Sequence, residues 1–304
     1  MQSIIFIVPY FGKWPEWMDL YIDSIRRNPT IDFLFITDCD TAVLTDIPNI
    51  SFRQITFEEY ISRYKKMLGE DIQITDPYKI CDLRPFFGII HEQDIHKYDF
   101  FGWTDTDLFF GNIRSFYTND ILQRYQVLST HAIRLSGHCT LLKNTPKYRT
   151  IGYQIYQWEE ALKNPDFIGI DEHGMTNALC MTFLDKVAEK LKCSINNRLL
   201  NGLRKWKARK YYFVEQYTTP FTSIPWIDGS LNSMQPDEWT YDKGIITNKR
   251  DKDRRFMYIH LMNFKSGKWR HDGTKAPWEE KEISMDIHPD YRITIDRHGI
   301  RTQL

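Results

Sequence analysis

The stretch FFGWTDTDLFFGNI, residues 100–113, holds two carboxylates, Asp105 and Asp107, inside an aromatic and aliphatic run. The apolar residues before them predict a buried strand that ends at the aspartates. Residues i and i+2 of a strand point to the same side, so both carboxylates are expected to face one point. A buried carboxylate needs a compensating partner, and a hard divalent cation, Mg²⁺ or Mn²⁺, suits oxygen ligands. The alternative is an Asp-Thr-Asp turn whose carboxylates only cap the following backbone.

The region before this stretch reads as the start of an α/β fold. Residues 3–8 form a continuous apolar run, residues 14–28 carry apolar side chains at helical spacing, and residues 32–37 read as the next strand. This βαβ order predicts a mainly parallel sheet that binds ligand at its strand ends. Neither a G-x-G-x-x-G fingerprint nor a P-loop occurs in the sequence. Further helices are expected at 57–68, 78–92, 145–162 and 174–191, strands at 126–130, 139–142 and 254–260, and a hairpin at 239–249.

Composition narrows the class of protein. The chain has 304 residues, is 42% hydrophobic and 15% aromatic, and carries no formal net charge. The size and apolar content suit one large globular domain, 1–304, and the absence of a basic excess argues against a nucleic-acid partner. Its five cysteines form no C-x-x-C pair, which favours a reducing compartment and no zinc knuckle.

The N-terminal segment and the hydropathy of the chain indicate the cellular compartment. The N-terminal residues lack the basic region and long apolar core of a signal peptide, and no segment has the ~20 apolar residues of a membrane helix. We therefore expect a cytoplasmic protein. The basic segment RLLNGLRKWKARKYYF, residues 198–213, is either a solvated helix face or a weak attachment to anionic lipid at the inner face of the cell membrane.

The segment YKICDLRPFFG supplies Lys79, Asp82 and Arg84 about twenty residues before the aspartates. Arginine suits bidentate recognition of phosphate or carboxylate, and a neighbouring aspartate can hold its guanidinium in place. The alternative is a structural ion pair between Asp82 and Arg84 that closes a helix.

Two segments in the second half carry further candidates. In SGHCTLLKN, Gly137 would let a ligand approach the backbone, and His138 either donates to a hydroxyl or is a packed core histidine. In IGIDEHGMTNAL, Asp171, Glu172 and His173 precede a predicted helix. These residues are either a general base and sugar-hydroxyl acceptors, or acids that the helix dipole favours without any function.

The segment HLMNFKSGKW begins with His260 at the end of a predicted strand and places Lys265 and Lys268 in the next loop. A neutral imidazole there would be a third metal ligand, and the lysines would meet phosphate charge.

The order of these features resembles the metal-dependent glycosyltransferases of the GT-A fold. The D-x-D, D-Q-D and H-x-x-G-x-K-P-W motifs of the glycogenin and lipooligosaccharide galactosyltransferase group have counterparts in residues 105–107, 171–173 and 260–269. YKICDLRPFFG followed by GWTDTDLFFGNI also resembles an uncharacterised group of bacterial enzymes encoded with capsule and O-antigen synthesis. The resemblance covers roughly residues 3–270. Two departures stand out: Asp171-Glu172-His173 replaces D-Q-D, and the segment after His260 lacks the glycine and the Lys-Pro-Trp.

The resemblance implies a nucleotide-sugar half, about 1–125, and an acceptor half, about 126–304. It implies that Mn²⁺ or Mg²⁺ on Asp105, Asp107 and His260 holds the diphosphate of a UDP-sugar, with Lys265 supporting the leaving group. The donor-binding set would be Pro9, Tyr10, Phe11, Thr37, Asp38, Lys79, Asp82, Arg84, Asp105, Thr106, Asp107 and Lys265. The sugar- and acceptor-binding set would be Gly137, His138, Asp171, Glu172 and His173, with Asp171 ahead of Glu172 as a catalytic base.

The expected function is transfer of a hexose, with galactose in pyranose or furanose form as the first choice, to an oligosaccharide or lipid-linked glycan. The pathway implied is capsule, O-antigen or lipopolysaccharide synthesis. Two other functions fit the same residues. A metal-dependent phosphoesterase or nucleotidyltransferase would use the paired acids for phosphoryl transfer, and a non-catalytic glycan-binding module would keep the fold without the chemistry.

Overall fold

The computed structural model describes residues 1–41, 47–181, 184, 185, 187, 202, 203, 206–216, 238–265, 275, 284–286, 292–296 and 299–303. The predicted helix 174–191 beyond Met181, most of the basic segment before Trp206, and Lys268 therefore lie largely or wholly outside the described residues. None of the helices in the described part of the chain has the length and apolar character needed to cross a bilayer.

Strand β1 (Ile4–Tyr10) shows why two layers form around one sheet. Its side chains alternate between faces, so Ile4, Phe6 and Val8 join one apolar core while Ile5 and Ile7 join the other. All five are buried because helices or a second sheet cover both faces. The continuous apolar run in the sequence follows from burial on both sides.

A seven-stranded sheet runs through the molecule in the order β3-β2-β1-β4-β7-β6-β8. Its members besides β1 are β2 (Asp32–Thr37), β3 (Ile50–Gln54), β4 (Phe100–Thr104), β6 (Val127–Ser129), β7 (Cys139–Lys143) and β8 (Tyr212–Phe213). The four strands from β3 to β4 are parallel to one another, β7 is antiparallel to β4 and β6, and β8 is parallel to β6. The predicted α/β class with a mixed, mainly parallel sheet is confirmed.

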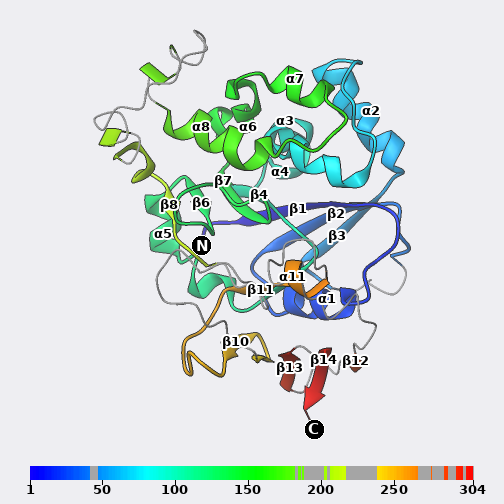
Figure 1. Ribbon diagram of the computed structural model, residues 1–304, viewed down its shortest axis with the longest axis vertical. Helices are drawn as coiled ribbons and strands as arrows, with labels where there is room; N and C mark the ends of the chain where they lie inside the picture. Colours follow the sequence, from blue (N-terminus) through cyan, green and yellow to red (C-terminus); the bar gives the residue numbers. More distant parts are fainter. Residues whose placement is uncertain are drawn as a thin grey trace.

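Helices cover the upper face of this sheet in Figure 1. They are α2 (Phe57–Leu68), α3 (Phe87–Ile90), α4 (Glu92–Ile95), α6 (Pro146–Arg149), α7 (Trp158–Lys163) and α8 (Met175–Cys180). Helix α2 has the predicted bounds because a capping box of Thr56 and Glu59 starts it, and Gly69, with φ 124°, follows its last turn.

Two predicted long helices are broken in the structure. Residues 78–92 form the 3₁₀ helix η2 (Pro77–Phe86), followed by α3 and α4, because Pro85 has no N–H to continue an α-helical ladder. Residues 145–162 form α6, the 3₁₀ turn η4 (Ile151–Gln154) and α7, with Gln157 in the left-handed region at φ 53° between them. The prediction of single helices was wrong at both places.

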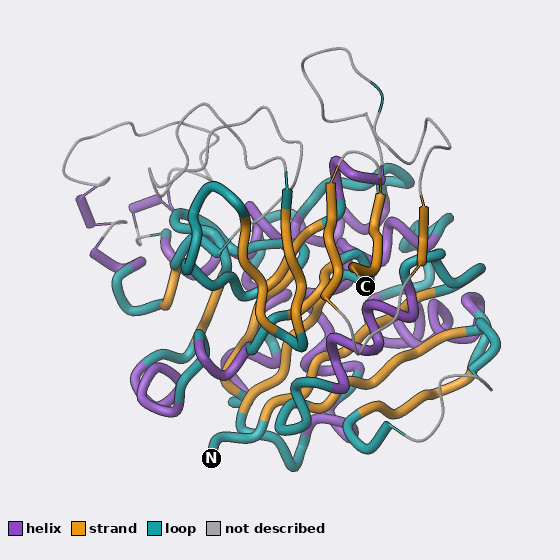
Figure 2. The backbone as a smooth tube through the Cα atoms, turned by 90° about the horizontal axis from the view of Figure 1, so that it is seen from below, coloured by secondary structure: helices purple, strands orange, loops and turns teal. Residues whose placement is uncertain are grey.

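The lower face is covered by α1 (Met18–Arg26) and by a pair of strands, β5 (Leu108–Phe110) and β11 (Tyr258–His260), with α11 (Met262–Lys265) after them. Below these lies a five-stranded sheet, β10 (Ile245–Asn248), β9 (Trp239–Asp242), β13 (Arg292–Asp296), β14 (Gly299–Gln303) and β12 (Ser284–Asp286). The β9–β10 hairpin agrees with the predicted hairpin. Figure 2 gives the view from below, with strands in orange and helices in purple.

The second sheet is tied to the main body through α1. The hydroxyl of Tyr241 in β9 donates to the Asp23 carboxylate at 3.2 Å, and Tyr241 and Trp239 belong to the same core as Ile4 and Phe6. The chain from β5 returns to the central sheet through the 3₁₀ turn η3 (Ile113–Ser115) and α5 (Asn119–Arg124). This arrangement brings β11, from the last fifth of the chain, beside β5 and the aspartates that precede it.

Candidate metal-binding active site

The Asp-Thr-Asp segment forms a turn between β4 and β5 rather than part of a strand. Two backbone hydrogen bonds hold it: Asp105 N donates to His138 O at 2.9 Å, and Leu261 N donates to Asp107 O at 2.9 Å. Asp105 directly follows β4, so the predicted strand end is confirmed, whereas the alternation argument was wrong. The turn, not the strand pleat, aims the two carboxylates at a common point.

The structure brings all three predicted metal ligands together. One ligand atom each from Asp105, Asp107 and His260 lies within 4.8 Å of the other two. His260 reaches this place because it ends β11 and pairs with Leu108, the first residue of β5. Two carboxylates and an imidazole are a donor set for a divalent cation such as Mn²⁺ or Mg²⁺.

Asp107 is the more deeply buried aspartate, with 3% of its surface exposed. Its Oδ2 lies 2.7 Å from Lys265 Nζ and 3.4 Å from His260 Nε2, while its Oδ1 has no hydrogen-bond partner among the described residues. Burial alone would raise the pKa of Asp107, but the charges of Lys265 and His260 outweigh burial and hold it well below its usual value. The carboxylate is therefore ionised and has one oxygen left to bind a cation.

Arg84 connects Asp105, one of the three candidate metal ligands, with Asp171. Its guanidinium contacts the carboxylate of Asp105, donates to Asp171 Oδ2 at 2.9 Å and donates to Gly137 O at 2.6 Å. Burial lowers the pKa of Arg84, but Asp105 and Asp171 outweigh it, and the group remains charged. The sequence left open an ion pair between Arg84 and Asp82. In the structure Arg84 pairs instead with Asp105 and Asp171, which are distant in sequence.

Lys79 and Asp82 were expected among the donor-binding residues, and the structure places them elsewhere. Both side chains are fully buried and lie 2.9 Å apart. Lys79 Nζ also donates to Ala161 O and Asp166 O, and Asp82 accepts the backbone N–H groups of residues 168–170. These bonds fasten the loop before Asp171, so the two residues position the site and are not in reach of a donor.

Asp171 and Glu172 lie on the short π-helical turn η5 (Ile170–Gly174), behind Gly137. Glu172 Oε1 accepts the N–H of Gly137 at 2.9 Å, and a Cβ on residue 137 would come within 2.9 Å of the same oxygen. A larger residue at 137 would therefore displace the Glu172 carboxylate from this position. His173, on the same turn, is exposed.

Asp171 differs from its neighbours in its ionisation. Only 1% of its surface is exposed, and its Oδ1 has no hydrogen-bond partner among the described residues. Burial raises the pKa of Asp171 to about 7, against the opposing attraction of Arg84. A carboxyl with this pKa can exchange a proton near neutrality, as a general base or acid must.

This pKa predicts a pH-dependent stability. Between about pH 4 and pH 7 the folded protein holds a proton on Asp171 that the unfolded chain has released, so the stabilisation present below pH 4 is lost as the pH rises through 7. In Asp171→Asn this loss should vanish. We expect the unfolding free energy of the wild type to fall relative to the variant by about 1–4 kcal/mol over this window.

Urea unfolding of wild type, Asp171→Asn and the exposed control Asp120→Asn across this pH range measures the effect. Parallel curves for wild type and Asp171→Asn would show that Asp171 titrates alike in the folded and unfolded states.

His138 is a packed residue that supports His260. Its Nε2 lies 2.7 Å from the Tyr258 hydroxyl, and its ring centroid lies 4.5 Å from that of His260. Burial, followed by the charges of His260 and His131, lowers the pKa of His138 well below its usual value, so the ring is neutral. The prediction that it donates to a bound hydroxyl is not supported by this position, and the packed alternative describes it.

A cavity of about 280 Å³ opens beside the triad. Of the predicted donor-binding residues, it is lined by Pro9, Tyr10, Phe11, Arg84, Asp105, Thr106, Asp107 and Lys265. Thr37 and Asp38 do not line it; Asp38 Oδ1 accepts the N–H of Gly12 at 2.7 Å and so shapes the turn after β1. Uridine contact by these two residues stays a prediction.

Tyr78 and Trp103, which were not predicted as site residues, also line this cavity. Tyr78 is 59% exposed and packs edge-on against Phe167, with ring centroids 4.9 Å apart. It is the first residue of the quoted YKICDLRPFFG segment, where an aromatic residue six positions before Arg84 was a usable signal for a ring-shaped ligand. Trp103 Nε1 donates to Gly137 O at 2.9 Å. In the sequence it could not be distinguished from the other apolar residues of β4.

Comparison with known proteins gives one family and several distant structures. The sequence model of a family of unknown function, DUF6625, matches residues 6–289. No curated protein matches the sequence.

Solved structures similar to this chain include galactosyltransferase LgtC in complex with donor and acceptor sugar analogues, at 12% identity and a TM-score of 0.37, covering 59% of this chain and 70% of LgtC. Mouse xyloside xylosyltransferase 1 in apo form is similar at 8% identity and a TM-score of 0.35, covering 71% of this chain and 87% of that one. The glycosyltransferase GlyE of Streptococcus pneumoniae is similar at 8% identity and a TM-score of 0.32, covering 69% of this chain and 50% of the GlyE chain. The likeness is distant in each case.

Proposed function

Because this chain belongs to the DUF6625 family, whose function is unknown, its activity has to be inferred from the site itself, and we propose that it is a metal-dependent glycosyltransferase. It would move a hexose from a UDP-sugar to a saccharide acceptor, with galactose as the first sugar to test. The fold would then be of the GT-A type, and the acceptor a glycan of bacterial capsule, O-antigen or lipopolysaccharide synthesis. The sequence motifs support this specific form of the proposal.

One observation carries the proposal: Asp105, Asp107 and His260 converge at the carboxyl end of a parallel strand, beside a cavity with aromatic and cationic walls. In open α/β sheets, ligands bind outside the carboxyl ends of the strands. The cavity presents Tyr10 and Tyr78 for a base or sugar ring, and Arg84 and Lys265 for phosphate charge. A diphosphate held by a divalent cation matches both parts of this site.

The residues present fit a divalent cation. Asp107 Oδ1 is buried without a hydrogen-bond partner among the described residues, and the ammonium of Lys265 already stands at its other oxygen. A positive charge is therefore favoured at this point. When bound, Mn²⁺ or Mg²⁺ would neutralise the negative charge that develops on the departing UDP.

The protein groups have separable roles in this proposal. Lys265, 38% exposed at its side chain, would interact with the leaving diphosphate, and Arg84 would hold Asp105 in place. Asp171, with its pKa near neutrality, would take the proton from the acceptor hydroxyl if the transfer inverts the anomeric carbon. If the transfer retains configuration, Asp171 and Glu172 would instead hold sugar hydroxyls.

The first test is binding of UDP in the presence and absence of metal. Calorimetry should show UDP affinity falling by about tenfold or more when EDTA replaces Mn²⁺, because the Asp105 and Asp107 carboxylates repel the diphosphate unless a cation lies between them. Equal affinity in both conditions would contradict the proposal. Phosphate release from a nucleotide sugar without any acceptor would favour a phosphoesterase, and saccharide binding unaffected by replacing both aspartates with alanine would favour a glycan-binding module.

Lys265 offers a second test. Its ammonium lies 2.7 Å from Asp107 Oδ2, on the same carboxylate as the oxygen left for a metal, so its charge repels the cation when no nucleotide is bound. Lys265→Met should therefore bind Mn²⁺ several-fold more tightly than wild type in the absence of UDP, while binding UDP more weakly in the presence of Mn²⁺. Calorimetric titration with Mn²⁺ alone, then with UDP, separates the two effects. Unchanged or weaker Mn²⁺ binding in this variant would show that the Lys265 charge does not oppose the cation.

A further inference from the structure

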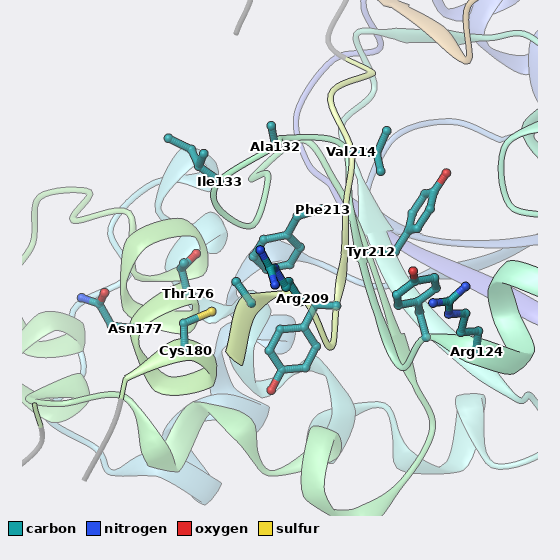
Figure 3. A pocket seen from close by; sticks show the side chains of 13 residues that line it. Arg124, Ala132, Ile133, Thr176, Asn177, Cys180, Arg209, Tyr212, Phe213 and Val214 are labelled. Carbon is teal, nitrogen blue, oxygen red and sulfur yellow. The ribbon is translucent and has the colours of Figure 1, made fainter. Parts of the chain in front are cut away.

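A second hollow lies at the edge of the central sheet. It has a volume of about 910 Å³ and lies between α8, β8 and the loop after β6 (Figure 3). Among the residues that the structure describes, none lines both this hollow and the cavity beside the aspartates. We call it the edge pocket, and its walls include Arg124, Tyr125, Arg209, Tyr211, Tyr212 and Phe213.

The edge pocket is positively charged. A smaller hollow of about 380 Å³ shares Arg124 and Arg209 with it and adds Lys147 and Lys210, and none of the described residues that line either space is acidic. The whole chain carries equal numbers of basic and acidic residues, 40 of each, so this is a local imbalance. Arg124 and Arg209 are exposed, and neither forms an ion pair with another described residue. Charge complementarity therefore favours an anionic ligand.

Aromatic rings supply the rest of the surface. The rings of Tyr125 and Tyr212 lie 5.2 Å apart, those of Tyr211 and Phe213 lie 5.8 Å apart, and all four residues are partly exposed. The guanidinium of Arg124 lies 5.3 Å from the centre of the Tyr125 ring. Aromatic faces with a few polar groups suit flat, weakly polar surfaces such as the C–H face of a sugar ring.

The edge pocket shares structural elements with the metal site. Thr176, in its wall, donates to the backbone carbonyl of Glu172 at 2.6 Å. Ala132 lines the edge pocket, while Gly137, five residues later in the same loop, contacts Glu172 and Arg84. Five residues of chain span at most about 18 Å, so a ligand of a few sugar rings in the edge pocket could reach Gly137, whose carbonyl accepts a hydrogen bond from Arg84.

We propose that the edge pocket binds an acidic saccharide, bearing carboxylate or phosphate, as the distal part of the acceptor glycan; the acceptor role rests on the proposed function. The basic segment singled out in the sequence contributes Arg209, Tyr211 and Tyr212 to this pocket. Figure 3 shows Phe213 and Arg209 among the side chains that line the hollow between α8 and the strands. A chain of sugar rings can enter such a hollow, whereas the plane of a bilayer cannot.

Calorimetry with the full chain tests the proposal, using tetragalacturonate and trehalose 6-phosphate as acidic probes and maltotetraose as the neutral one. At least one acidic probe should bind about tenfold or more tightly than maltotetraose. Arg124→Ala/Arg209→Ala should lower that affinity about tenfold or more, and Arg124→Lys/Arg209→Lys should lower it less. The exposed pair Arg26→Ala/Lys66→Ala, on other helices, is the matched control and should bind like wild type.

UDP binding with Mn²⁺ should be unchanged in Arg124→Ala/Arg209→Ala, which separates the two sites. If acidic saccharide binds through Arg124 and Arg209 but UDP shows no metal dependence, the pocket assignment stands and the glycosyltransferase proposal fails. If neither acidic probe binds, or both bind the double variant equally well, the pocket assignment is overturned. Binding to phosphatidylglycerol vesicles that the double variant loses, without saccharide binding, would likewise overturn it in favour of a membrane contact.

Discussion

Asp107→Asn is expected to lower the affinity for Mn²⁺ by about 100-fold or more, because losses of 10- to 100-fold are usual even for residues that only orient a ligand. Asp107 supplies a buried, ionised carboxylate with one oxygen that has no hydrogen-bond partner among the described residues. Asparagine keeps the size of the side chain but removes its charge. Titration of free Mn²⁺ by electron paramagnetic resonance, with UDP present, measures the change.

Two controls test whether a loss of Mn²⁺ affinity is specific to Asp107 and is not caused by unfolding. Asp120→Asn makes the same chemical change at an exposed position on α5 and should leave Mn²⁺ affinity unaltered. Circular dichroism and urea unfolding should show that Asp107→Asn remains folded, since the Lys265 ammonium is 38% exposed and can be solvated once its partner is neutral. A folded Asp107→Asn protein with wild-type Mn²⁺ affinity would remove Asp107 from the metal site.

Lys79→Met is expected to destabilise the protein by about 3 kcal/mol, the lower end of the cost of breaking a buried ion pair. Both Lys79 and Asp82 are fully buried, and methionine would leave the Asp82 carboxylate without its cation. The backbone N–H groups of residues 168–170 still donate to Asp82, which limits the loss. Urea unfolding at neutral pH, with the exposed Lys66→Met as the matched control, measures the free energy of unfolding.

This prediction also separates a structural role from a donor-binding one. If Lys79 acts through the loop before Asp171, Lys79→Met should lower stability while the UDP affinity with Mn²⁺ stays close to that of the wild type. A variant with wild-type stability and weakened UDP binding would return Lys79 to the donor site and contradict its buried position.

Local sequence patterns were enough for the elements near the site. The apolar run of β1, the capping box of α2 and the position of Asp105 after β4 all depend on residues close together in the chain. The convergence of Asp105, Asp107 and His260 was predicted through resemblance to a family, since about 150 residues separate the acids from the histidine. The pairing of β5 with β11 supplies the physical cause of that convergence.

The segment from Lys79 to Arg84 shows what the sequence left undecided. From the sequence alone, Lys79 and Arg84 are both candidates to bind phosphate, and Asp82 is a candidate partner for Arg84. In the structure the segment is a 3₁₀ helix, in which residues three apart eclipse one another, so Lys79 and Asp82 share the buried side. Arg84, two residues later, points to Asp105 and Asp171 instead.

The sequence by itself therefore determined the α/β class, the end of the strand before the aspartates and the identity of the candidate ligands, because neighbouring residues encode these features. Only the tertiary structure decided that the side chain of Arg84, and not that of Lys79, reaches the site. It also decided that burial raises the pKa of Asp171 to about 7 and that an aromatic, basic pocket forms at β8. Each of these depends on groups that folding brings together from distant segments. Desolvation and charge pairing arise only when those groups meet.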